Sequence, residues 1–336
     1  MSDGPLTVYL DGAYLPAGEA RVSVDDRAFL FADGVYEVTK VQGTFIFVCA
    51  TLRRLRKNAP RITHHNSVTQ TEAEHFARLR RGLSELRIDY DAAAELPGIV
   101  RELYKRNGFS TQAYVYIQVT RGSAAPRAHA WHGTTPKPTV YASLKPYTFP
   151  SLEEFCSGKT AIVEPDQRWA RCDLKTTSLL PNALANQRAK EAGAYEALFT
   201  RNVGGEECVV EASHSNVFAV LRHAGGELEL VTPPLRNILP GVTRGVTLAR
   251  GAGDAALLAE AGVARIREGD VPLAAIFDGS CVELMVTAST SFVTPITKVE
   301  GVGSVGDGGV GPAARALRAA WVRWWEEDCA AWEARK

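Results

Sequence analysis

Strand-like and helix-like segments alternate along nearly the whole chain, and this alternation constrains the fold most. Asp11-Gly12 lies between two short apolar runs, a strong signal for a β-hairpin. Residues 72–107 have the helical period, since Phe76, Leu79, Leu83 and Leu86 recur at spacings of three and four. Further strand-like runs cover residues 35–47, 113–122 and 139–147. The first part of the chain therefore predicts an α/β unit.

The second part mixes the same two kinds of element. A helix is expected over 183–194, closing at Gly193, and another should begin around Gly241-Val242-Thr243. The final segment reads as a helix whose aromatic stripe packs against the body of the protein: Trp321, Trp324, Trp325 and Trp332. Strand-like runs lie at 160–165, 195–201, 209–221, 284–290 and 291–299. We therefore expect an α/β (α+β) chain with two domains, residues 1–150 and 151–336.

Residues 48–71 do not fit this pattern, because they are basic and polar and lack apolar periodicity. Without them, the strand ending at Phe47 would join the following helix smoothly. We interpret 48–71 as an insertion, either an exposed loop or a short helix. His64-His65 invite a metal site, but no third ligand is in view, so none is expected.

Composition narrows the classes of function. Lys plus Arg and Asp plus Glu each number 38, which argues against a nucleic-acid or anionic-membrane binder. No apolar stretch reaches the roughly 18 residues of a membrane span, and no signal peptide is recognisable. The six cysteines are scattered without metal-ligand spacing, so neither a zinc site nor a disulfide framework is expected. We expect a cytoplasmic protein.

Five segments occur in an order that indicates chemistry: DDRAFLFADGVYEV, VTRGSAAPRAH, RWARCDLKTTSLLPNALANQRAKEAGAYEA, VVEASHSNVF and ILPGVTR. Taken alone, a lysine in such a stretch reads as a surface residue, and a single glutamate as a carboxylate at a strand edge. In combination, the segments resemble the class IV (fold type IV) aminotransferases, and among them bacterial D-amino-acid transaminases most. The resemblance spans roughly residues 8–300, apart from 48–71.

The resemblance implies a two-domain fold with pyridoxal 5'-phosphate in the cleft between the domains, bound mainly by the larger one, 151–336. It implies that Lys175 forms the Schiff base with the cofactor and shuttles a proton. It also implies that Glu211 pairs with the pyridine nitrogen, so that the ring acts as an electron sink. A buried carboxylate is costly without a facing cation, which fits this pairing.

For the cofactor phosphate, the family uses an arginine in an H-x-x-R-L pattern. Arg78 in HFARL matches, and Arg54 in the insertion competes. We prefer Arg78, because it continues into the helix that the fold needs. Val242 and Thr243 should add amides at a helix start. The other cofactor-binding positions implied are Ser215, Asn216, Leu239, Ala288 and Ser289; Ala288 stands where relatives often carry a hydroxyl residue, and His214 replaces a common serine.

For the substrate carboxylate, the resemblance implies Arg127 and His129 in a loop and Tyr36 from the first strands. Arginine suits a carboxylate through its two-pronged geometry. A basic surface loop is the alternative reading of Arg127 and His129. The implied protein is a homodimer, in which this loop reaches the neighbouring subunit's site. The implied reaction transfers the amino group of a D-amino acid such as D-alanine to 2-oxoglutarate, giving a 2-oxo acid and D-glutamate.

Three alternatives stay open from the sequence. The donor could be an L-branched-chain amino acid or an (R)-amine, which a stereochemical assay separates. The chain could cleave aminodeoxychorismate, releasing pyruvate, although the loop at Arg127 speaks against this. It could also be a binding or vestigial module, which a colourless protein that cannot be reconstituted would indicate.

Overall fold

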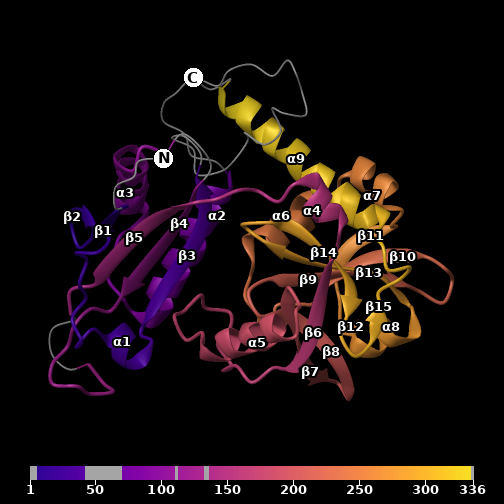
Figure 1. The fold of residues 1–336 in the computed structure, drawn as a ribbon, viewed down its shortest axis with the longest axis horizontal. Coiled ribbons are helices and arrows are strands. Elements are labelled where there is room, and N and C mark those ends of the chain that lie inside the picture. Colours follow the sequence, from indigo (N-terminus) through magenta and orange to yellow (C-terminus); the bar gives the residue numbers. More distant parts are fainter. Residues whose placement is uncertain (1–5, 42–69, 110–112, 132–135, 334–336) are drawn as a thin grey trace. The chain divides into compact units, whose positions relative to one another are not determined.

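The computed structural model describes residues 6–41, 70–109, 113–131 and 136–333 (Figure 1). They belong to two compact units. The first unit contains Met1–Phe149, Leu174–Ser178 and Asp328–Lys336, and the second contains Pro150–Asp173 and Leu179–Glu327. Lys175 therefore groups with the first unit, whereas the sequence-based boundaries put it in the domain 151–336.

The first unit contains a five-stranded antiparallel sheet in the order β2-β1-β5-β4-β3. Asp11 and Gly12 have φ values of 49° and 98°, as the turn of the predicted hairpin requires. The predicted hairpin and the strands after it are thus confirmed within the described residues. The strands are β1 (Thr7–Leu10), β2 (Ala13–Pro16), β3 (Gly34–Val41), β4 (Ala113–Thr120) and β5 (Thr139–Pro146).

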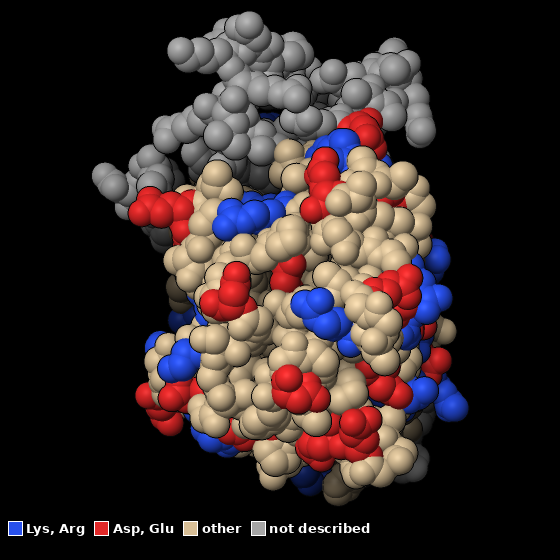
Figure 2. All heavy atoms as spheres, turned by 90° about the vertical axis from the view of Figure 1, so that its right-hand side faces the viewer, with Lys and Arg blue, Asp and Glu red and all other residues tan. Residues whose placement is uncertain are grey.

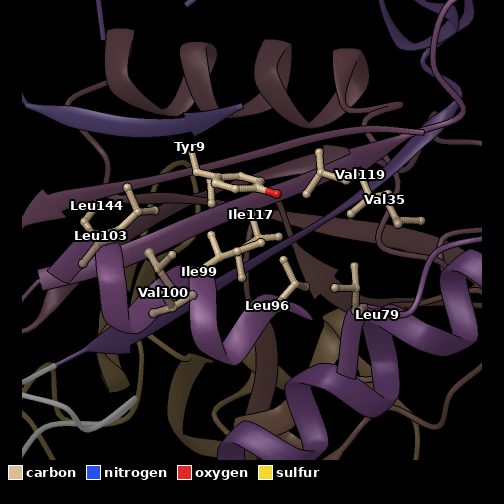
Figure 3. Packing of buried hydrophobic residues seen from close by; sticks show 14 of the residues in the cluster. Tyr9, Val35, Leu79, Leu96, Ile99, Val100, Leu103, Ile117, Val119 and Leu144 are labelled. Atoms are coloured by element: carbon tan, nitrogen blue, oxygen red, sulfur yellow. The ribbon is translucent and has the colours of Figure 1, made fainter. Parts of the chain in front are cut away.

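Helices α2 (Gln70–Leu86) and α3 (Ala92–Arg106) pack their apolar side chains against this sheet (Figure 3). A short helix, α1 (Arg27–Phe31), precedes β3. In Figure 3, Leu79 of α2 and Leu96 of α3 both lie on the side of the sheet that the helices cover. Burying such side chains contributes about 1.5–3 kcal/mol each, so the core holds the helices on the sheet.

The helical prediction for 72–107 is confirmed over most of this range, but the range is divided between two helices. Arg87 adopts a left-handed conformation with φ 54°, and the Asp91 side chain caps α3 by accepting from Ala94 N at 3.2 Å. The apolar period gave no sign of this break, because Ile88 in the connection is also buried. Most of the expected insertion 48–71, with Arg54, His64 and His65, lies outside the described residues; Gln70 and Thr71 already belong to α2.

The second unit contains a ten-stranded sheet in the order β11-β10-β9-β13-β14-β6-β7-β8-β12, with β15 beside β14. Three pairs are parallel, namely β6–β7, β6–β14 and β10–β11. The strands are β6 (Lys159–Pro165), β7 (Glu196–Val203), β8 (Glu206–Ala212), β9 (Asn216–Arg222), β10 (Leu228–Thr232), β11 (Arg265–Glu268), β12 (Val271–Pro272), β13 (Cys281–Ala288), β14 (Phe292–Val299) and β15 (Gly303–Ser304).

The prediction of a single strand over 209–221 was wrong. The chain leaves β8 after Ala212 and re-enters the sheet at Asn216. β8 pairs with β7, whereas β9 pairs with β10 and β13. The three residues between them form a turn that becomes important below.

The helices of the second unit are α4 (Leu152–Cys156), α5 (Leu180–Glu191), α6 (Val242–Gly251), α7 (Ala255–Ala261) and α8 (Leu273–Asp278). The last helix, α9 (Pro312–Glu333), belongs to this unit as far as Glu327. α5 begins at Leu180, three residues before the expected start. In α9, Trp321 and Trp324 are each 4% exposed, and Trp321 stacks on Phe292 at 4.9 Å. Packing of the stripe against the body is thus confirmed for these two tryptophans.

Three features concern the charged surface, the cysteines and the helices. Acidic and basic side chains are interspersed over the face shown in Figure 2. Among the described residues, the free thiols are those of Cys156, Cys172, Cys208 and Cys281. Within this described part, no helix has the length and apolar character needed to cross a membrane.

Candidate active site

Lys175 lies beside the edge strand β3 of the first unit. Its carbonyl oxygen accepts a hydrogen bond from Tyr36 N at 2.9 Å, and Thr177 N donates to Gly34 O at 3.1 Å. These bonds align the segment with the strand. The Lys175 amine thereby lies 4.1 Å from the centre of the Tyr36 ring. The backbone therefore determines where this amine is presented.

The residue after Tyr36 in β3, Glu37, is the centre of a buried ion-pair cluster. Arg78 of α2 binds the Glu37 carboxylate with two nitrogens, at 2.7 and 2.8 Å, and His75 Nδ1 lies 2.8 Å from the same group. Burial alone would raise the pKa of Glu37, but Arg78 and His75 outweigh it and hold this pKa well below its usual range. Glu37 thus fixes the guanidinium that the sequence assigned to the cofactor phosphate.

Tyr36 belongs to an aromatic row on the other face of the sheet. Its ring stacks on Tyr116 at 5.7 Å, and Tyr116 contacts Tyr141 at 6.3 Å. Burial raises the pKa of Tyr116 to about 12, so its hydroxyl stays protonated and donates to Gln118 Oε1 at 2.6 Å. The Lys175 amine thus lies against Tyr36, the first ring of a row of three tyrosines.

Arg127 and His129 meet at Phe31 of α1. The Arg127 guanidinium lies 4.5 Å from the Phe31 ring centre, and the His129 ring lies 5.3 Å from it. Both side chains are exposed. The loop therefore presents an arginine and a histidine together, as a group that binds a carboxylate requires.

In the second unit, Glu211 is the second-last residue of β8 and lies in a buried cluster. Its carboxylate contacts the Arg168 guanidinium, which also binds Asp166 at 2.7 and 2.9 Å. Leu239 N donates to it at 3.2 Å and Asn216 Nδ2 at 3.3 Å. Burial raises the pKa of Glu211 to about 7, although Arg168 acts in the opposite direction. Such a carboxylate can either hold a proton or face a cation near neutral pH.

The turn after Glu211 is held by one carboxylate, that of Glu196 at the start of β7. Ser213 N donates to it at 3.1 Å, Ser215 Oγ donates at 2.8 Å, and His214 Nδ1 lies 2.8 Å away. Glu196 is fully buried. His214, which stands where relatives commonly carry a serine, is thus the middle residue of a three-residue turn whose members all contact Glu196. This polar anchor explains why the chain does not continue as one strand.

The start of α6 lies next to the same turn. Asn216 Nδ2 donates to Leu239 O at 2.9 Å, and a Cβ on Gly241 would lie only 1.9 Å from Asn216 Oδ1. Only glycine fits here, so the chain approaches Asn216 closely. Gly241 precedes α6 without a side-chain cap, so the amides of Val242 and Thr243 face outward from a helix N-terminus.

Residues at the end of β13 reach this place as well. Thr287 is the register partner of Asn216, and Ala288 and Ser289 follow it. The Thr287 hydroxyl is buried without a hydrogen-bond partner among the described residues. An anion at the start of α6 would supply one. The donors here therefore fit a phosphate group.

The predicted site residues thus form two groups, one in each unit. Lys175, Tyr36 and Arg78 gather around β3, with Arg127 and His129 on a loop of the same unit. The second group surrounds the start of α6: Glu211, Ser215, Asn216, Leu239, Val242, Thr243, Ala288 and Ser289. The sequence reasoning missed the buried partners Glu37, His75, Asp166, Arg168 and Glu196. Four of these five stand in segments quoted above, namely Glu37 in GVYEV, His75 in HFARL, Arg168 in RWARCDLK and Glu196 in GAYEA, but the segments alone did not show which residues these side chains bind.

Comparison with known proteins places the chain in a family. The family model for class IV amino-transferases matches residues 61–299. D-alanine aminotransferase of Staphylococcus haemolyticus is 32% identical over 302 residues, covering 88% of this chain and 89% of that protein. The enzyme of the same name from Bacillus licheniformis is 31% identical over 299 residues, with the same coverage of both chains.

Solved structures show the same fold. The branched-chain amino acid aminotransferase of Escherichia coli has 21% identity and a TM-score of 0.71, covering 94% of this chain and 93% of that one. A hypothetical aminotransferase from Mycobacterium tuberculosis, solved in a PLP-bound form, has 18% identity and a TM-score of 0.64 over 94% and 98%.

The chain belongs to the class IV aminotransferases. It is therefore an aminotransferase with the mixed α/β architecture of fold type IV, as the motifs predicted.

Proposed function

We propose that this aminotransferase transfers the amino group of a D-amino acid, D-alanine among them, to 2-oxoglutarate, giving a 2-oxo acid and D-glutamate. The pairing of Arg127 with His129 at Phe31 carries this proposal, because these two side chains offer the substrate carboxylate a fixed pair of donors. The similarity to D-alanine aminotransferases over most of the chain supports it.

The residues of both groups fit pyridoxal 5'-phosphate as the cofactor. When bound, this cofactor supplies an aldehyde that captures amines and a ring that takes up negative charge from Cα. Arg78, with the amides of Val242 and Thr243 and the hydroxyl of Ser289, would bind its phosphate. The buried hydroxyl of Thr287 has no hydrogen-bond partner among the described residues, and this observation favours an anion at the start of α6.

Lys175 would hold the cofactor through its amine, and the same amine would move a proton from the substrate Cα. Glu211 would keep the pyridine nitrogen protonated, and Asn216 and Leu239 N hold the Glu211 carboxylate in place. Ser215 positions the turn beside it. Tyr36 lies against the Lys175 amine and excludes water from one side. Arg127 and His129 bind the substrate carboxylate.

We further propose a cytoplasmic homodimer in which the loop bearing Arg127 and His129 completes the site of the neighbouring subunit. This arrangement would bring the second copy's carboxylate-binding pair to Lys175. We also propose the domain division at residues 1–150 and 151–336.

A half-reaction tests the proposal. Holoenzyme is mixed with D-alanine and, separately, with L-leucine, and the loss of the cofactor's long-wavelength absorbance is followed. D-Alanine alone should cause rapid bleaching, and Lys175→Ala should abolish transfer because no other amine replaces the proton carrier. Full turnover by Lys175→Ala would disprove the role of this lysine.

The second candidate is a branched-chain L-amino-acid transaminase, which the solved structures of that activity favour. Bleaching by L-leucine alone would support it, and would make Arg127 and His129 ordinary loop residues. Bleaching by an (R)-amine, a donor that has no carboxylate, would indicate an (R)-amine transaminase. Release of pyruvate from aminodeoxychorismate as a single substrate would indicate a lyase instead.

A further inference from the structure

The loop that bears Arg127 and His129, called the recognition loop below, is held by an arginine from outside it. Arg27, the first residue of α1, is only 4% exposed. Its Nε donates to Asp33 Oδ2 at 2.8 Å, and its two terminal nitrogens donate to the carbonyl oxygens of Ala128 at 2.6 Å and His129 at 2.9 Å. Two of its three nitrogens therefore bind the carbonyl oxygens of the peptide groups on either side of His129.

Asp33 gives Arg27 a fixed base. Arg121 binds the same carboxylate with two nitrogens, at 2.7 and 2.9 Å. Arg121 also donates to the carbonyl oxygens of Leu86 at 2.6 Å and Arg87 at 3.1 Å, where α2 ends. The guanidinium of Arg27 is therefore tied through Asp33 and Arg121 to the helix packed on the sheet.

The start of the loop is tied to the same short segment. Arg27 N donates to Gly122 O at 3.0 Å, and Ala124 N donates to Asp25 O at 3.2 Å. Phe31 lies one helical turn after Arg27, so both occupy one face of α1. The Arg27 guanidinium lies 4.8 Å from the Phe31 ring centre. Arg27 and Phe31 thus form one surface on which the loop rests.

We propose that Arg27 is a positioning residue for substrate recognition. By binding the carbonyl oxygens of Ala128 and His129, it sets the geometry in which Arg127 and His129 receive the substrate carboxylate. This inference rests on the proposed function, since it assigns those two side chains to the carboxylate. Arginine is needed because its planar group binds several acceptors in fixed directions, whereas lysine offers one nitrogen.

The test uses the holoenzyme with Arg27→Lys, which keeps the positive charge. The KM for D-alanine should rise about tenfold, which corresponds to the loss of one or two charge-assisted hydrogen bonds. The kcat and the cofactor absorbance should stay unchanged, because neither Lys175 nor the phosphate donors are touched. Arg106→Lys is the matched control, since Arg106 pairs with Glu102 on the surface of the same unit.

Two further measurements separate positioning from a general structural role. In a variant that already carries Arg127→Ala and His129→Ala, adding Arg27→Lys should leave the KM unchanged, because the effect acts through those side chains. Trypsin should also cleave after Arg127 several times faster in Arg27→Lys than in the Arg106→Lys control, since the loop backbone has lost its donors.

The outcomes are distinguishable. Unchanged KM in Arg27→Lys, in an enzyme that transaminates D-alanine, would overturn the inference and leave the proposed function intact. An equal KM increase in the background lacking Arg127 and His129 would overturn it too, as would loss of cofactor. A wild-type enzyme that accepts no D-amino acid would overturn the proposed function, and the inference with it.

Discussion

Glu211 shows how burial and a nearby cation compete at a single carboxylate. Burial raises its pKa, while Arg168, Asn216 and the amide of Leu239 favour the ionised form. Arg168 is itself shared with Asp166, so its charge is not fully available to Glu211. A group balanced in this way responds strongly to a further cation, and a protonated pyridine nitrogen is such a cation.

This balance predicts a pH dependence of stability. The Glu211 pKa is about 7 in the folded chain and 4.5 without the fold, so the folded state binds the proton more tightly. The resulting stabilisation is complete below the lower value and is lost as the pH rises through about 7. Between pH 5 and 8, we expect the unfolding free energy of the apoprotein to fall by about 1–3 kcal/mol relative to Glu211→Gln.

Urea unfolding of both apoproteins across this pH range measures the difference. Other titrating groups are common to the two proteins and cancel. If the two stability curves ran parallel, burial would not raise the pKa of Glu211 in the folded apoprotein, and the balance between burial and Arg168 described above would be wrong.

At the scale of elements, periodicity identified most helices and strands but not their interruptions. The breaks at Arg87 and at Ser213–Ser215 lie in stretches whose apolar pattern continues on both sides. The second break depends on Glu196, which binds Ser213 from 17 positions away. A local pattern carries no trace of a partner that is distant in sequence, so this turn could not have been predicted.

The packing of the tryptophans of α9, which the sequence predicted, can be tested through stability. Trp321 stacks on Phe292, and its Nε1 donates to Thr247 Oγ1 at 3.1 Å. We expect Trp321→Ala to lower the unfolding free energy by about 3–5 kcal/mol, because a buried aromatic leaves a cavity. Trp321→Phe should cost less, about 1 kcal/mol for the lost hydrogen bond plus some packing.

Denaturant unfolding of these variants checks the prediction. Trp169→Ala serves as the control, because Trp169 is 44% exposed and should change stability little. Equal losses in Trp321→Ala and Trp169→Ala would mean that α9 contributes no specific packing.

At the scale of the whole molecule, the proposed dimer predicts complementation between two inactive variants. Lys175→Ala keeps the recognition loop, and Arg127→Ala keeps the lysine. In a mixed dimer, one of the two sites would contain both intact parts. Unfolding and refolding an equal mixture should recover roughly a quarter of the wild-type sites, by random pairing of subunits.

Transfer activity of the refolded mixture with D-alanine at a concentration far below the KM of Arg127→Ala measures the recovery. Each variant refolded alone is the control. If the mixture were no more active than the average of the two controls, the loop would serve the site of its own chain.

The sequence motifs indicated the residues of the proposed site, but not the buried side chains that hold those residues in place. Lys175 and Glu211 stand in recognisable segments, so their roles could be inferred from resemblance. Glu37 and Glu196, the carboxylates that hold their neighbours, also stand in recognisable segments, but a segment does not show that a carboxylate is buried. Only the fold shows that each faces several donors.

The pairing of the Lys175 segment with β3 limits how this chain can be divided. Leu174–Ser178 lies along β3, which otherwise pairs, among the described residues, with β4 alone. A fragment ending at Phe149 would leave the amide of Tyr36 and the carbonyl oxygen of Gly34 without these partners, and an open strand edge of this kind pairs readily with other chains. Truncation at the apparent boundary should thus yield an aggregating fragment, and exchange of either half between relatives by a single crossover would separate the lysine from the strand that positions it.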